Sequence, residues 1–223
     1  DPGAAAALVR EVGPAVVLLA SPNNPTGTAL PAPDLVTVLE AARGNGPDGS
    51  DAIVVVDEAY GEFRREGTDS ALTLRGEYPH LVVCRTMSKA FGMAGLRLGY
   101  CAAHGDVVDA LRIVRLPYHL SAVTQAAARA ALAHRDSLMA QVAHLRAERD
   151  GLVQWLRAQG LEAVDSDANF VLFGVFGNRR RIWEDLLERG ILIREVGPEG
   201  YLRVTVGTPE ETAAFKEALR EVM

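Results

Sequence analysis

The first 85 residues contain three short apolar runs, and a helical pattern lies between the first run and the second. Residues 15–20 (AVVLLA), 52–56 (AIVVV) and 81–85 (LVVCR) are such runs, and none has the polar alternation of a half-exposed strand. Runs of this length and composition predict strands buried on both faces of a sheet. A helical pattern at 33–43 follows the first run. Strand, helix and strand at this spacing predict a parallel α/β sheet, to which 97–102 would add a strand.

The rest of the chain is first helical and then mixed. Residues 105–115 and 122–133 have helical spacing, and 136–159 form a long amphipathic stretch that ends near Gly160. After this stretch the pattern predicts strands at 169–173, 191–194 and 201–206 and helices at 179–189 and 209–221. We therefore expect the C-terminal part of a large domain at 1–135, a connecting helix at 136–160 and a small α+β domain at 161–223.

Composition excludes several classes of partner. The 223 residues carry a formal net charge of −6, which argues against nucleic acid and anionic membranes. No apolar run approaches the roughly 20 residues that a membrane span needs. The two cysteines, Cys84 and Cys101, lie in apolar segments, as small core residues of a reducing compartment do. We expect a cytoplasmic protein without a metal site.

Polar residues follow three of the apolar runs. They are Asn24, then Asp57 with Tyr60, and then the segment from Thr86 to Lys89. Ligands of open α/β sheets bind outside the carboxyl ends of the strands, so these residues are expected to converge on one crevice. Taken singly, Asn24 also suits a turn, Asp57 a helix N-cap and Tyr60 a core position with a wet hydroxyl.

Lys89 is the most informative of these residues. It is one of only two lysines, the other being Lys216, in a chain that has 21 arginines. Its small and apolar neighbours favour the uncharged amine, which can attack a carbonyl group. The hydroxyls of Thr86 and Ser88 and the guanidinium of Arg97 could hold a phosphate nearby. The alternative is a solvated loop lysine.

Two arginines of the C-terminal part are candidates for binding a substrate carboxylate. Arg203 is flanked by apolar strand residues, and Arg194 ends the preceding run. A guanidinium that faces a crevice can clamp a carboxylate through two parallel hydrogen bonds. A single strand arginine is more often a surface residue, and Asn169 is equally ambiguous.

Four segments together resemble the class I/II, fold-type I aminotransferases that use pyridoxal phosphate. They are SPNNPTG at 21–27, DEAY at 57–60, TMSKAFGMAGLR at 86–97 and YLRVTVGT at 201–208. Their order and spacing agree with the family's motifs along essentially the whole chain. Within this family the chain is most similar to the histidinol-phosphate aminotransferases, through 116–125 (LPYHLSAVTQ), 168–173 (ANFVLF), 190–194 and 202–208.

The resemblance implies a fold, an activity and a role for each candidate residue. The fold would be the pyridoxal-phosphate transferase fold of type I, with part of a mostly parallel sheet in the large domain. The activity would be transamination of L-histidinol phosphate with 2-oxoglutarate in a homodimer. Lys89 would carry the cofactor and move the proton of the substrate. Asp57 would pair with the ring nitrogen of the cofactor, and Asn24 and Tyr60 would hydrogen-bond to its ring oxygen. The cofactor phosphate would be held by Thr86, Ser88 and Arg97. Arg203 would bind the carboxylate of glutamate or 2-oxoglutarate.

Three alternatives and one departure accompany this resemblance. Aromatic amino acid aminotransferases and some decarboxylases of phosphorylated amino acids share much of this pattern, and the third alternative is a non-enzymatic, aminotransferase-like sensor domain. Family members also carry a long segment before the position of Asp1, and it supplies a phosphate loop and a ring that stacks on the cofactor. We therefore expect this chain to be a piece of a longer one and, by itself, a weak or inactive catalyst.

Overall fold

A computed structural model describes residues 1–223 and divides them into two compact units. Unit 1 consists of Asp1–Ser21, Leu30–Gly61 and Gly67–Leu138, and unit 2 consists of Pro22–Ala29, Glu62–Glu66 and Met139–Met223. Two short loops that leave the strands of unit 1 therefore belong to unit 2.

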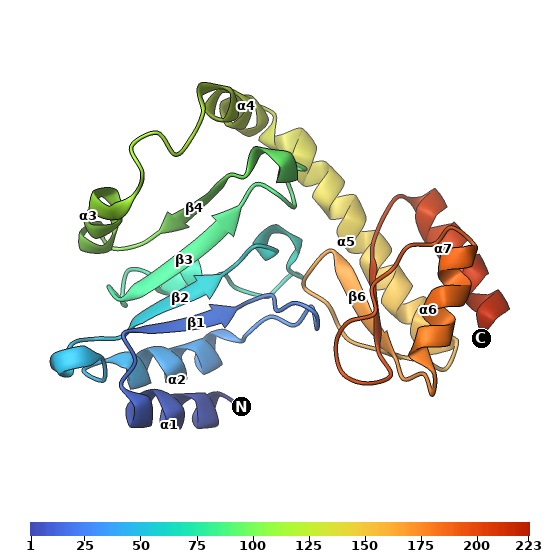
Figure 1. Ribbon diagram of the computed structural model, residues 1–223, viewed down its shortest axis with the longest axis horizontal. Helices are drawn as coiled ribbons and strands as arrows, with labels where there is room; N and C mark the ends of the chain where they lie inside the picture. Colours follow the sequence, from blue (N-terminus) through green and yellow to red (C-terminus); the bar gives the residue numbers. More distant parts are fainter. The chain divides into compact units, whose positions relative to one another are not determined.

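The sheet of unit 1 has four strands in the order β1-β2-β3-β4 (Figure 1). Strands β1 (Val16–Ala20), β2 (Ile53–Asp57) and β3 (Leu81–Thr86) are parallel, and β4 (Gly99–Ala102) runs antiparallel to β3. The predicted α/β class with a mostly parallel sheet is thus confirmed.

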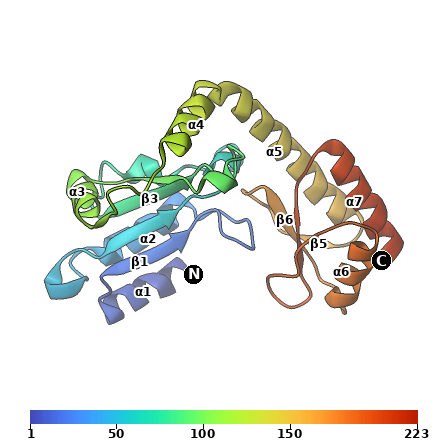
Figure 2. The ribbon, with the colours of Figure 1, turned by 45° about the horizontal axis from the view of Figure 1, so that its top comes forward.

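Two helices, α1 (Pro2–Val12) and α2 (Ala32–Ala42), cover one face of this sheet (Figures 1 and 2). The strand residues that face them are Val17, Leu19, Val54, Val56, Leu81 and Val83. The prediction that residues 15–20 form a strand buried on both faces was wrong, because Val16 and Leu18 are 50% and 76% exposed. Strand β1 is an edge strand, and both helices pack on its other side.

The helices that follow are α3 (Gly105–Val114), α4 (Ala122–Ala133) and α5 (Arg135–Ala158). Helix α5 contains the boundary between unit 1 and the C-terminal segment of unit 2. Short 3-10 turns occur at Pro47–Gly49, Gly61–Phe63, Ala71–Leu74 and Ala94–Leu96. None of the helices combines the length and the apolar composition that crossing a bilayer requires.

Unit 2 has an antiparallel sheet of β5 (Glu162–Ala163), β6 (Phe170–Gly174) and β7 (Leu202–Thr205). Helices α6 (Arg179–Glu188) and α7 (Pro209–Val222) and the end of α5 supply the rest of its core. The ring of Phe173 meets those of Phe176 and Phe215 edge-on. The predicted strand at 191–194 was wrong, since only Arg194 pairs there, in an isolated bridge to Arg203.

Candidate functional site

The strand ends of unit 1 present different side chains on the two faces of the sheet. Asp57 ends β2 and pairs with Cys84 of β3, and Thr86 lies two residues further along β3. Because strand residues alternate between faces, all three lie opposite the face that α1 and α2 cover. Burial raises the pKa of the Cys84 thiol, and the nearby Cys101 and Asp57 raise it further.

The loop after β3 folds back on itself and carries Lys89. The main-chain NH of Ser88 donates to Thr86 Oγ1 (3.2 Å), and the two hydroxyl oxygens are 3.0 Å apart. The main-chain NH of Met87 donates to Leu98 O (3.0 Å) and so closes the loop. Arg97 lies near this closure, in the left-handed region at φ 51°, with its side chain exposed. The loop thus holds two hydroxyls near the strand end, and the Arg97 guanidinium donates to Ala94 O (3.0 Å) within the same loop.

Lys89 lies beside the turn that follows β2. Its Nζ is 5.4 Å from the centre of the Tyr60 ring, a cation–π contact. Asp57 Oδ1 accepts from the main-chain NH of Ala59 (2.9 Å), which holds that turn. Asp57 and Lys89 are both exposed, so the prediction that apolar neighbours shield the Lys89 amine from water was wrong for this structure. Carboxylate, phenol and amine thus come together in unit 1, as the pattern of strand ends predicted for this part of the site.

The other predicted residues lie in unit 2. Arg203 Nη1 donates to Asn24 Oδ1, and the Arg203 guanidinium stands 4.6 Å from the centre of the Phe170 ring. Arg194 and Arg203 exchange two main-chain hydrogen bonds (2.9 and 2.8 Å), so their side chains share one face. Asn169, just before β6, accepts through its main-chain oxygen from the main-chain NH of Val206, just after β7 (2.9 Å). Two guanidinium groups on one face suit an anionic ligand.

Asp167 and Arg149 hold the two loops that unit 2 takes from the early chain. The Asp167 NH donates to Gly27 O (2.7 Å), and the Asp167 carboxylate accepts from the main-chain NH and Nη2 of Arg65 (2.8 and 3.1 Å). This bond raises the pKa of Arg65. Arg149 is fully buried and donates to Phe63 O, and burial lowers its pKa.

Sequence reasoning missed both of these residues. A signal for Arg149 was present, because the arginine interrupts the apolar stripe of the long helix between Leu145 and Leu152. A charged residue at such a position must find buried partners. Asp167 gave no comparable signal, since its partners lie more than a hundred residues away.

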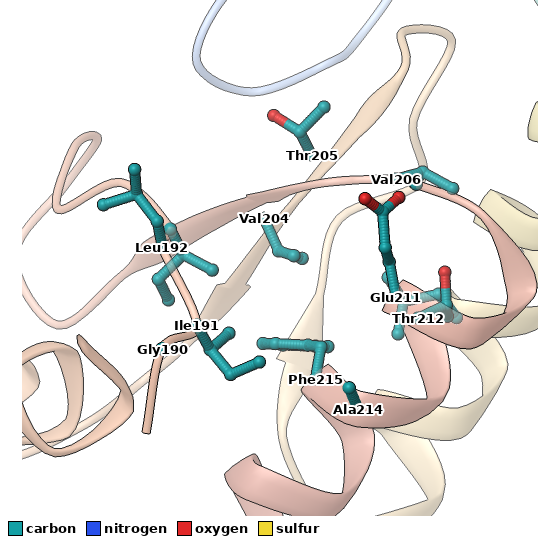
Figure 3. A pocket seen from close by; sticks show the side chains of 13 residues that line it. Gly190, Ile191, Leu192, Val204, Thr205, Val206, Glu211, Thr212, Ala214 and Phe215 are labelled. Carbon is teal, nitrogen blue, oxygen red and sulfur yellow. The ribbon is translucent and has the colours of Figure 1, made fainter. Parts of the chain in front are cut away.

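A cavity of about 430 Å³ lies in unit 2, between β7, α7 and residues 190–193 (Figure 3). Its lining is mostly apolar, with Val204 and Phe215 among its residues. Glu211 also lines it, but its carboxylate accepts from the main-chain NH of Thr208 and caps α7. None of the predicted site residues lines this cavity, so we do not assign the chemistry to it.

Two features can be compared with known proteins: the mostly parallel sheet with its lysine loop in unit 1, and the paired arginines in unit 2. The chain matches the family described as aminotransferase class I and II over residues 3–219. It belongs to that family.

Its relatives narrow the resemblance. The chain is 63% identical to the histidinol-phosphate aminotransferase of Thermobifida fusca, across 98% of this chain and 58% of that protein. It is 59% identical to histidinol-phosphate aminotransferase 3 of Burkholderia lata, across 96% and 56%. The solved histidinol-phosphate aminotransferase of Sinorhizobium meliloti, in complex with pyridoxal-5'-phosphate, superposes with a TM-score of 0.86. It is 29% identical, across 100% of this chain and 61% of that one. The chain thus spans somewhat more than half the length of these relatives.

Proposed function

We propose that the protein transfers the amino group of L-histidinol phosphate to 2-oxoglutarate with pyridoxal phosphate as cofactor, in histidine biosynthesis. The products are imidazole acetol phosphate and L-glutamate. The observation that carries the proposal is the Lys89 amine beside the Tyr60 ring, at the strand end that also bears Asp57. The names of the relatives at 59% and 63% identity support the choice of substrate.

The donor groups of unit 1 fit pyridoxal phosphate. A carboxylate such as that of Asp57 suits a protonated ring nitrogen, and a free amine suits the aldehyde carbon. The adjacent hydroxyls of Thr86 and Ser88 and the guanidinium of Arg97 suit a phosphate. Each part of the cofactor therefore has a chemical partner among these residues.

The proposed mechanism assigns each residue one task. Bound pyridoxal phosphate supplies an electron sink for the charge that develops at the substrate α-carbon. The Lys89 amine would accept the proton released at the substrate α-carbon and would pass it to the former aldehyde carbon of the cofactor. Asp57 keeps the ring nitrogen protonated, and Tyr60 and Asn24 hydrogen-bond to the ring oxygen.

The remaining tasks concern anions. Thr86, Ser88 and Arg97 bind the cofactor phosphate. Arg203 binds the carboxylate of glutamate or 2-oxoglutarate through two parallel hydrogen bonds, with Arg194 and Asn169 beside it. Because the substrates are small dissolved metabolites, we propose a cytoplasmic location. We also propose that the protein acts as a homodimer, with domains at 1–135 and 161–223 joined by 136–160.

The role of Lys89 is tested by adding pyridoxal phosphate, reducing with borohydride and mapping the modified peptide. We expect the label at Lys89, with Lys216→Arg unchanged and Lys89→Arg unlabelled. A label at Lys216, or none at all, contradicts the proposal.

The substrate is tested with the intact protein, by following glutamate formation from 2-oxoglutarate. We expect turnover with L-histidinol phosphate and little with phenylalanine or tyrosine. Failure to react with L-histidinol phosphate excludes this substrate, and preference for an aromatic amino acid would assign the other aminotransferase activity.

A further inference from the structure

Glu58 and Arg85 lie directly next to the residues of the proposed cofactor site, on the opposite face of the sheet. Glu58 follows Asp57, and Arg85 precedes Thr86. Strand alternation therefore directs both side chains toward the face that α1 and α2 cover. Glu58 is 1% exposed, and the Arg85 side chain is 11% exposed.

These two side chains form a buried ion pair with additional hydrogen bonds. Arg85 Nε and Nη2 lie 2.8 and 2.6 Å from Glu58 Oε2. Ser70 Oγ donates to Glu58 Oε2 (2.7 Å) and accepts from Arg85 Nη2 (3.1 Å). The main-chain NH of Ala71 donates to Glu58 Oε1 (2.7 Å). Both carboxylate oxygens are thus bonded, as a buried charge requires.

The pair also supports the turn that carries Tyr60. The main-chain NH of Gly61 donates to Glu58 O (2.8 Å), and that of Glu58 donates to Cys84 O (2.9 Å). A Cβ atom on Gly61 would lie 3.0 Å from the guanidinium carbon of Arg85. The turn therefore packs closely against the Arg85 guanidinium at Gly61. Arg85 itself belongs to β3, the strand that leads into the lysine loop.

We propose that the Glu58–Arg85 pair is a positioning device that fixes Tyr60 and Asp57 against Lys89. It joins the end of β2 to the end of β3 on the face opposite Asp57 and Thr86, so it would act only through the residues that it positions. The significance of Lys89 rests on the proposed function, but the placement of its amine is measurable without the cofactor.

Four variants weaken the pair in different ways. Glu58→Gln removes the negative charge, and Arg85→Lys removes the planar fork that binds Glu58 and Ser70. Ser70→Ala and Gly61→Ala are milder, since they remove one hydroxyl or add one methyl group. Tyr78→Phe serves as the control, because it removes another partly buried hydrogen bond of unit 1, to Glu40.

The test is the rate at which a limiting amine reagent labels Lys89, divided by the rate for Lys216, which serves as an internal standard. Loss of the pair frees the Tyr60 ring from Nζ. We expect the ratio to rise about 2- to 5-fold, the size of a lost exposed cation–π contact. Melting temperatures are measured in parallel, and labelling is done well below them.

A purely structural role predicts a different result. Melting temperatures would fall in the variants as in Tyr78→Phe, with an unchanged labelling ratio, and this outcome would overturn the inference. If Glu58→Gln and Arg85→Lys do not fold, the ratios of Ser70→Ala and Gly61→Ala decide.

A second measurement separates this inference from the proposed function. Pyridoxal phosphate should bind several-fold more weakly to Glu58→Gln and with full affinity to Tyr78→Phe. A wild-type protein that binds no pyridoxal phosphate contradicts the proposed function, whereas the labelling ratio still decides the positioning role.

Discussion

Gly27 lies where neither the backbone nor the available space admits a side chain. Its φ is +79°, and a Cβ atom would lie 2.3 Å from Ser166 Oγ. Asp167 also binds the Gly27 carbonyl, three residues after Asn24. This hydrogen bond therefore holds the loop whose asparagine accepts from Arg203.

Replacing Gly27 by alanine should lower the free energy of unfolding for two reasons, the left-handed backbone and the clash with Ser166. Gly49, at φ +75° with no atom within 4 Å of its Cβ position, is the matched control. We expect Gly49→Ala to cost about 1 kcal/mol for the left-handed backbone alone. Gly27→Ala should cost about 1–3 kcal/mol more, because the methyl group must displace Ser166. Urea denaturation measures both, and equal losses for the two variants would refute the steric argument.

The sequence allowed the placement of some single residues to be predicted but not that of others. The placement of Asp57 and Lys89 at neighbouring strand ends was predictable, because the carboxyl ends of parallel strands meet at one edge of the sheet, whereas their roles stay predictions. Glu58 and Arg85 escaped prediction, because a pairing between residues 27 positions apart leaves no periodic signal. An arginine closing an apolar strand run was the one hint.

Helix α7 begins with a capping box formed by Thr208 and Glu211. Thr208 accepts from the main-chain NH of Glu211 (3.3 Å), and the Glu211 carboxylate accepts from that of Thr208 (2.8 Å). Pro209 occupies the first turn. The helix can therefore begin with three residues between it and the end of β7, and the main-chain NH groups of Thr208 and Glu211 are satisfied.

Thr208→Ala should destabilise the protein by about 1 kcal/mol, the usual effect of losing a capping hydroxyl. The loss appears as a lower midpoint of urea unfolding. Glu217→Ala, at an exposed position of the same helix, should change stability by less than about 0.5 kcal/mol. A Thr208 variant as stable as the Glu217 variant would show that the capping box contributes nothing.

Elements with a strong apolar pattern were predicted to within about two residues, and the weakly patterned ones were not. Helix α1 was missed because it is rich in alanine and buries only Ala6 and Val9. The run 191–194 has strand composition, yet Leu192 is 71% exposed and pairing is confined to Arg194. Composition cannot reveal whether a partner strand continues alongside.

Unit 1 leaves a group of apolar side chains uncovered on and between α3 and α4. They are Ile113, Val114, Leu116, Tyr118 and Val123, each at least 73% exposed. Helix α3 has no buried residue at all. An apolar surface of this kind is typical of association sites, and we propose a second copy of the chain as the partner that covers it.

Light scattering after size exclusion tests the homodimer. We expect a dimer for the wild-type protein and a shift to monomer for the double variant Ile113→Asp, Tyr118→Asp, because burying two carboxylates at an interface is costly. Leu187→Asp, at an exposed apolar position of α6, should remain dimeric. A monomeric wild-type protein, or a dimeric double variant, would argue against this surface.

Unit 2 is assembled from distant stretches of chain. The bond between Arg65 and Asp167 spans 102 residues, and the bond between Arg203 and Asn24 spans 179. A ribosome that releases the chain from its N-terminus exposes the loops 22–29 and 62–66 long before their partners are made. Unit 1 can form most of its sheet during synthesis, but Asn24 must wait until Arg203, 179 residues further along the chain, has left the exit tunnel.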